Sequence, residues 1–297
     1  MKTFRILGLA LVVTGLLFAG CKKTEEEDEE DEGTAISLDV SAPETASNKN
    51  ALVEEFTGTN CGYCPDGHKR VNELIAANPG KVFAINIHTG RLAAKYTTSF
   101  GAALAEQSWL TGYPAGTVNR HEFEGWQEDT NRTHQNRTAL NRGYFQAAAN
   151  QIMAQPACAN IAAKATINKS TREVTVGVAV YYTGTPTGST NMINVAITED
   201  SIWGPQSENA SASNPAQWNS DHTLYCHTHM LRHLITGQWG DEITPVVGKQ
   251  IKKEYKYTLP QTISNETVLP EHLHIIAFLC EGHHEVINVC SAPITFK

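Results

Sequence analysis

The sequence has no basic patch with interleaved aromatic residues, and its formal net charge is −8. Such patches are typical of proteins that bind nucleic acids, so we expect no nucleic-acid partner. No repeat of fixed period is visible, and the N-terminal apolar run, Ile6–Ala19, is too short to span a membrane comfortably. The composition, with 41% apolar residues in a chain of 297, is that of a globular protein with room for two domains.

The N-terminus has the features of an export signal. Lys2 and Arg5 precede the apolar run, and small residues lead up to Cys21. This order predicts a signal peptide over residues 1–20. The Ala-Gly-Cys ending resembles a bacterial lipobox, although Phe18 stands where Leu is usual. The resemblance implies that Cys21 carries a lipid anchor with palmitate among its acyl chains. The alternative is ordinary secretion with an incidental cysteine.

An acidic run follows Cys21. Residues 22–32 contain eight acids and two lysines. Because like charges repel, such a run is typical of a solvated, extended spacer. It also resembles the surface-export signals of Bacteroidetes lipoproteins, which implies an outer-membrane location with display at the cell surface; a periplasm-facing location is the alternative. We interpret residues 21–50 as an acidic tether with a possible edge strand at Ile36–Val40.

The motif with the most chemical content is Cys61-Gly62-Tyr63-Cys64. It follows a strand-like apolar run and opens a segment with helical spacing. Two thiols at a helix N-terminus close easily into a disulfide, and the partial positive charge there stabilises a thiolate. The arrangement is typical of a redox pair in which Cys61 attacks and Cys64 resolves the mixed disulfide. The alternative is a permanently closed structural disulfide.

Three further features resemble thioredoxin. Glu55 lies six residues before Cys61, the spacing of the buried acid that helps to move protons there. Tyr113-Pro114 leads into a strand-like run, where thioredoxin-like folds place a cis-proline. The apolar run Lys81–His88 completes the order strand, Cys pair, helix, strand, helix, proline, strand. The resemblance implies a thioredoxin-like α/β domain over residues 51–155, with Glu55 and Pro114 in its site.

The hydrophobic pattern separates two halves of the chain. In the first half we expect helices over Asp66–Ala77, 97–109 and 137–154. From Ala157 the period becomes two, and seven strands are expected: Ile161–Ile167, Val174–Tyr182, Met192–Thr198, Leu224–Leu234, Gln250–Leu259, His272–Leu279 and Val286–Phe296. This spacing predicts an antiparallel, immunoglobulin-like β-sandwich over residues 156–297. The long polar loop Ile202–Ser220 is of a kind that is often functional.

The motif residues also match a known family. The segment Glu54–Gly67 resembles the outer membrane protein 28-related lipoproteins of Bacteroidetes. The resemblance extends to Tyr113-Pro114, His229–Arg232 and Gly237–Asp241. It implies a thioredoxin-like domain joined to a β-sandwich on an outer-membrane lipoprotein.

Four cysteines remain after Cys21 and the Cys pair are assigned: Cys158, Cys226, Cys280 and Cys290. An even remainder in an exported protein indicates two structural disulfides. Cys280 and Cys290 flank a hairpin that places them on opposite faces, or about 13 Å apart along the strand, which is too far for a bond. Each should therefore pair with Cys158 or Cys226, and we favour 158–290 with 226–280. Free buried cysteines are the alternative.

Histidines cluster around Cys226, and the segment includes His222, His227, His229 and His233. If this segment is a strand, only His227 and His229 share a face. Zinc usually takes three or four ligands, so we expect no metal site and no cofactor.

These features predict a lipoprotein of the outer membrane that exchanges disulfides with an extracytoplasmic protein through Cys61 and Cys64. Whether it is an enzyme stays open. The alternative is a non-enzymatic surface binding or adhesion protein in which the same disulfide is structural. The sequence predicts no oligomeric state.

Overall fold

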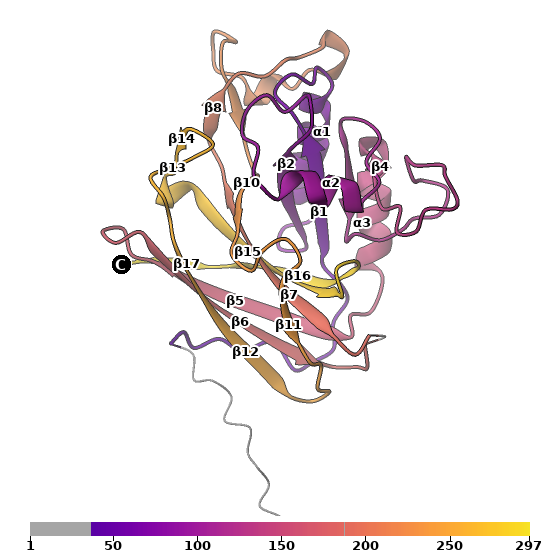
Figure 1. The fold of residues 1–297 in the computed structure, drawn as a ribbon, viewed down its shortest axis with the longest axis vertical. Helices are drawn as coiled ribbons and strands as arrows, with labels where there is room; N and C mark the ends of the chain where they lie inside the picture. Colours follow the sequence, from indigo (N-terminus) through magenta and orange to yellow (C-terminus); the bar gives the residue numbers. More distant parts are fainter. Residues whose placement is uncertain (1–36, 187) are drawn as a thin grey trace, which may run out of the picture. The chain divides into compact units, whose positions relative to one another are not determined.

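The computed structural model describes residues 37–186 and 188–297, so the expected signal peptide, Cys21 and the acidic run lie outside the described residues. Most of the regular secondary structure in the described chain is β-strand, with few helices (Figure 1). The helices are α1 (Cys64–Ala77), α2 (Gly101–Gln107) and α3 (Phe145–Met153), with short 3-10 turns at η1 (Arg142–Tyr144), η2 (Ala210–Ala212), η3 (Pro215–Gln217) and η4 (Pro270–His272). The strands are β1 (Ala51–Thr57), β2 (Val82–His88), β3 (Ala115–Val118), β4 (Leu140–Asn141), β5 (Ala159–Ile167), β6 (Glu173–Tyr182), β7 (Asn191–Glu199), β8 (Ile202–Gly204), β9 (Tyr225–His227), β10 (Met230–Leu234), β11 (Asp241–Ile243), β12 (Gln250–Thr258), β13 (Thr262–Ile263), β14 (Glu266–Thr267), β15 (Leu273–Glu281), β16 (Val286–Ala292) and β17 (Ile294–Phe296).

The first half contains the expected order of elements, β1-α1-β2-α2-β3. β1 pairs with β2 in parallel and with β3 antiparallel, so it is the central strand of this part of the sheet. Its seven residues are all buried. α1 and α3 pack on one face through Val71, Leu74, Phe145 and Ile152, and α2 packs on the other through Leu104. Glu54 and Glu55 are neighbours in β1 and therefore point to opposite faces of the sheet. Both are buried, because β1 is covered on both faces.

The same sheet continues into the second half of the chain. Its nine strands follow the order β16-β15-β7-β10-β2-β1-β3-β4, with β11 added beside β7. The connection is a short parallel contact between Met230 of β10 and Asn86 of β2. The amide of Asn86 donates to the carbonyl of His229 at 2.7 Å, and its side chain donates to the carbonyl of Thr228 at 2.9 Å. The sheet therefore crosses the expected boundary at residue 156, and the described residues belong to one compact unit.

The second half also contains two sheets packed face to face. The four-stranded sheet β12-β6-β5-β17 lies against the part of the large sheet formed by β7, β15 and β16. Their inward side chains form one apolar core that includes Val176, Val178, Val195, Ile275 and Ala277. In Figure 1, β5, β6 and β12 lie in the lower part of the view, away from the helices around β1.

Several expected elements differ from those of the structure. The third helix starts at Phe145 instead of residue 137, because Leu140–Asn141 pairs with β3 as β4. The expected strand Leu224–Leu234 is two strands, since His229 has a left-handed backbone with φ of 53°. The expected strand Val286–Phe296 is broken at Pro293, which cannot donate to a ladder.

The expected edge strand at Ile36–Val40 is not formed over its described part, Ser37–Val40. Side chains of β12 bind this segment in place of a strand ladder. Glu254 accepts from the amide of Ser37 at 2.7 Å, and Gln250 accepts from that of Ala42 at 3.1 Å. Val40 and Ala42 are nevertheless buried, against Ala179 of β6.

Candidate functional site

The Cys pair is a closed disulfide at the N-terminus of α1, with the two Cα atoms 5.4 Å apart. The turn is fixed by main-chain bonds, because the amide of Cys61 donates to the carbonyl of Gly58 and that of Cys64 to the carbonyl of Cys61. Pro65 fits the first helical turn, where its missing amide hydrogen costs nothing. The sequence prediction of strand, Cys pair and helix is confirmed here.

Glu55 lies beside the start of α1. A Cβ atom at Gly67 would lie 2.1 Å from Oε1 of Glu55, so only glycine allows this close approach. Both carboxylate oxygens are buried without a hydrogen-bond partner. Burial therefore raises the pKa of Glu55 well above its usual value, and the charge of Arg142 opposes this rise only in part. Burial thus favours the protonated carboxyl group over the carboxylate at this position.

The Tyr113-Pro114 peptide bond is cis, as predicted from the sequence. Pro114 directly precedes β3, whose Ala115 and Gly116 pair with Phe56 and Glu55 of β1. A Cβ atom at Gly67 would lie 3.0 Å from Cβ of Pro114. The proline, the buried acid and the first turn of α1 therefore meet at one place.

An ion-pair network borders this place. Arg142 of η1 donates to Asp66 of α1 at 2.6 Å, and Arg70 donates to the same carboxylate at 2.9 Å. Partial burial alone would raise the pKa of Asp66, but the bonds from the two arginines hold it below its usual value. The network joins the first turn of α1 to the start of α3.

A buried histidine lies one helical turn after Cys64. Nε2 of His68 lies 2.8 Å from the hydroxyl of Thr57, and Nδ1 lies 2.9 Å from the hydroxyl of Tyr225, which comes from β9 in the second half of the chain. Burial lowers the pKa of His68 to about 3, and the nearby His227 contributes. His68 was not predicted from the sequence as a site residue, although its spacing of four from Cys64 places both residues on one face of α1.

His88, His227 and Tyr96 pack edge to face beside His68, with ring centroids 5.0–5.3 Å apart. Both ring nitrogens of His88 and the hydroxyl of Tyr96 are buried without a partner. Burial lowers the pKa of His88 well below its usual value and that of His227 to about 4. All three histidines of this group are therefore neutral at neutral pH.

The histidines singled out in the sequence do not lie together. His227 belongs to the buried group, His222 is exposed, and the amide of His229 binds Asp200. Across residues 37–186 and 188–297, no three His, Cys, Asp or Glu side chains are arranged to hold a metal ion.

The four remaining cysteines are free thiols in the structure, so the expected pairings 158–290 and 226–280 are not formed. Cys280 lies in the core shared with α2, whereas Cys158 and Cys290 border the core between the two sheets. Cys226 lies opposite Trp203 in the small sheet β8-β9. Cys226 and Cys280 thus lie in separate parts of the structure, whereas Cys158 and Cys290 border the same core without being bonded.

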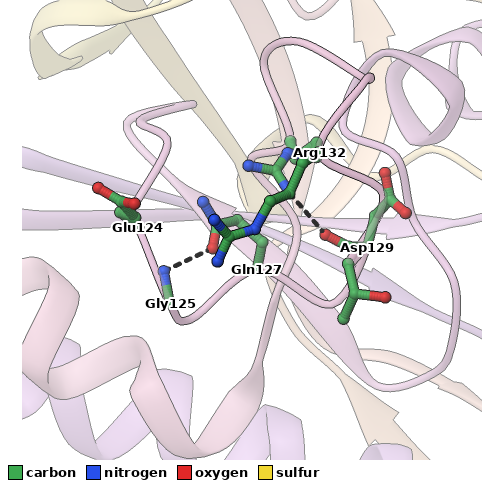
Figure 2. Close-up of a pocket in the computed structure, with 7 residues that line it drawn as sticks. Glu124, Gly125, Gln127, Asp129 and Arg132 are labelled. Carbon is green, nitrogen blue, oxygen red and sulfur yellow. Dashed lines mark hydrogen bonds between the residues drawn. The ribbon is translucent and has the colours of Figure 1, made fainter.

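A pocket of about 250 Å³ lies elsewhere, in the loop between β3 and β4. Figure 2 shows the carboxylates of Glu124 and Asp129 and the guanidinium of Arg132 around it. Its polar lining includes no residue of the site around the Cys pair.

A protein-family model matches the chain from α2 to its last strand. The model of the family described as outer membrane protein Omp28 matches residues 102–296. The chain belongs to this family. Membership supports an outer-membrane location, but the match begins after the Cys pair and does not bear on its role. No helix among the described residues is long and apolar enough to cross a membrane.

Two solved structures from Porphyromonas gingivalis are similar to this Omp28-family chain. HBP35 is 19% identical, with a TM-score of 0.62 over 84% of this chain and 78% of that one. The similarity shows a shared fold. A domain of the outer membrane lipoprotein Omp28 is 22% identical and covers 48% of this chain and 91% of its own length, with a TM-score of 0.31. No curated protein matches the chain significantly.

Proposed function

We propose that this Omp28-family protein is a lipid-anchored outer-membrane protein that exchanges disulfides with an extracytoplasmic protein partner. Its first half would be a thioredoxin-like domain and its second half an immunoglobulin-like sandwich. The observation that carries the proposal is the meeting of three features at the start of α1. These are the Cys61–Cys64 disulfide, cis Pro114 and the unpartnered Glu55.

In the proposed reaction, a substrate thiolate attacks the sulfur of Cys61 and the S–S bond breaks. Cys64 leaves as a thiolate and takes a proton from Glu55, whose raised pKa makes it a proton donor. A second substrate thiolate then attacks the substrate sulfur of the mixed disulfide and releases Cys61. The substrate loses two electrons and the Cys pair gains them. The reverse sequence reduces a substrate disulfide, with Glu55 taking the proton from Cys64.

Trapping tests this proposal. Cys61→Ser should abolish exchange with a model disulfide protein such as insulin, because the attacking sulfur is lost. Cys64→Ser should retain partners as mixed disulfides, since the resolving thiol is missing. Cys226→Ser is the matched control, because that free thiol lies in a separate small sheet. Absence of both exchange and trapping in folded, reducible protein would contradict the redox role.

One observation favours a second function. Cys61 is only 3% exposed and Cys64 is 0% exposed, which suits a structural disulfide in a surface binding protein. That function predicts no exchange in the wild type and no trapped partners. The effects of cysteine changes would then be confined to stability, and small, because a loop of this length has little closure entropy.

The anchor is tested separately. Cys21→Ser should release the protein into soluble fractions, because the acylated sulfur is lost; continued membrane association would contradict lipidation. Protease added to intact cells should remove the protein if it is displayed at the surface, and neutralising the acids of residues 25–32 should protect it.

A further inference from the structure

The segment between β8 and β9 lies over the Cys pair. We call residues 205–214 the cap segment. The amide of Ser207 donates to the carbonyl of Thr59, and the amide of Asn209 donates to the carbonyl of Gly62, both at 2.7 Å. The side chain of Gln206 adds a bond to the carbonyl of Cys61 at 3.0 Å. The cap segment thus binds the motif mainly through main-chain groups two residues apart.

The disulfide is buried beside the cap segment. Asn60 directly precedes Cys61 and Tyr63 lies two residues after it; both are exposed, Tyr63 by 48%, yet Cys61 is only 3% exposed. A Cβ atom at Gly62 would lie 3.6 Å from both N and Cβ of Asn209, which is van der Waals contact. A thiolate must reach one of the two sulfurs directly to open a disulfide. Cys61 and Cys64 are buried in the structure, in which the cap segment is bound to the motif.

The cap segment is held by a carboxylate that does not touch the Cys motif. Glu208 accepts from the amide of Asn214 at 2.8 Å, the indole of Trp218 at 2.9 Å and the hydroxyl of Ser213 at 3.1 Å. Its other neighbour is His222, at 3.3 Å. Partial burial would raise the pKa of Glu208, but these bonds hold it below the usual value. The carboxylate is therefore ionised at neutral pH and keeps all three bonds.

A second attachment reaches the interior. The side-chain amide of Asn214, at the end of the cap segment, donates to the hydroxyl of Tyr225 at 3.1 Å. That hydroxyl also lies 2.9 Å from His68 of α1. The two ends of the cap segment are thus fixed at β8 and at Tyr225, whereas the part over the cysteines depends on Glu208 and on the main-chain bonds.

We infer that the cap segment is an intramolecular occupant of a peptide-binding surface and must move aside before the Cys pair reacts. The carbonyls of Thr59 and Gly62 accept from alternate amides of the cap segment, as they would from an extended polypeptide that carries a cysteine. Closure is independent of the redox proposal, whereas the identity of the displacing partner rests on it. The cap segment keeps the disulfide closed until such a polypeptide competes for the same carbonyls.

The experiment is native-state reduction by a small phosphine, followed by maleimide labelling of the released thiols. Glu208→Ala removes the acceptor of three bonds and should speed reduction about tenfold or more, because each bond to a charged group is worth about such a factor. Asp221→Ala is the matched control, since Asp221 is an exposed acid in the same loop whose carboxylate accepts from the amide and hydroxyl of Thr223, outside the cap segment. It should be reduced at the wild-type rate.

Circular dichroism checks that each variant is folded, and Gln206→Ala replaces Glu208→Ala if the latter does not fold. Equal reduction rates for wild type and a folded cap variant would overturn the inference, as would wild-type reduction as fast as that of a free Cys-Gly-Tyr-Cys peptide. Insulin exchange by the same variants separates the two proposals. If the cap variants are reduced faster by phosphine but show no exchange with insulin, the inference about the cap segment stands and the redox function is refuted. A short extended cysteine-containing peptide should compete with the cap segment and speed reduction in the wild type.

Discussion

The buried acid offers the sharpest test of the site. We expect Glu55→Gln to change the pH dependence of stability without unfolding the protein, because glutamine keeps the shape of the side chain and removes its ionisation. In the folded protein, burial raises the pKa of Glu55 well above the reference value of 4.5. The contribution of Glu55 to stability is therefore fully present below about 4.5 and is lost as the pH rises to the folded pKa.

The magnitude follows from linkage. Within that window the unfolded chain has released a proton that the folded protein retains, so the free energy of unfolding falls by about 1.4 kcal/mol per pH unit. In the variant this slope is absent. The glutamine amide also lacks a partner, which adds a constant penalty of about 1–3 kcal/mol at every pH. The diagnostic quantity is how the difference in free energy of unfolding between wild type and variant changes with pH, not the size of that difference at one pH.

The assay is urea unfolding of both proteins, with the disulfide intact, at several pH values from about 5 to 8. His68, His88 and the other titrating groups are present in both proteins, so their contributions cancel when the two free energies of unfolding are subtracted. Glu73→Gln on the exposed side of α1 is the control and should give a flat difference from wild type. A flat difference for Glu55→Gln as well would refute the reasoning, because Glu55 would then ionise alike in the folded and unfolded states.

Three other variants test the packing around the site. His88→Phe should raise the melting temperature more at about pH 5 than at neutral pH, because the lowered pKa of His88 gives stability above about 6.5 that is lost as the pH falls; equal shifts would contradict this. Arg120→Met should cost about 3–5 kcal/mol in urea unfolding, since it leaves Glu54 buried and unpaired. Adding Glu54→Leu should recover most of that loss, and a single-variant cost below about 1 kcal/mol would be inconsistent with a buried pair. Gly116→Ala should cost about 1–3 kcal/mol, because its Cβ atom would lie 2.5 Å from the main-chain oxygen of Glu54; an unchanged unfolding midpoint would refute this.

The local part of the site was predictable from the sequence. A Cys pair directly before a helical pattern, an acid six residues earlier and an X-Pro step into a strand each concern short stretches of chain. Their geometry depends on neighbouring residues, and the structure places Glu55 and Pro114 together at Gly67. The cis bond at Pro114 was predicted in the same way and is confirmed.

The parts that were missed depend on contacts between distant segments. His68 looks like an ordinary helix residue until Tyr225, 157 positions later, lies against it. The even number of remaining cysteines predicted two disulfides, but all four are free thiols, and Cys226 and Cys280 lie in separate parts of the structure. The polar loop 202–220 was recognised as unusual, yet its position over Cys61 could not be derived from its composition.

The sequence by itself determined the main strands and helices around the Cys pair and the residues that form the disulfide at the start of α1, because period, capping and turn residues act over a few positions. Only the tertiary structure decided that β10 joins β2, so that one sheet runs through both halves of the chain. Only it decided that residues 205–214 cover the Cys pair. The physical reason is that main-chain hydrogen bonds between distant strands and loops carry no side-chain signature. Which carbonyl an amide meets is set by how whole sheets pack.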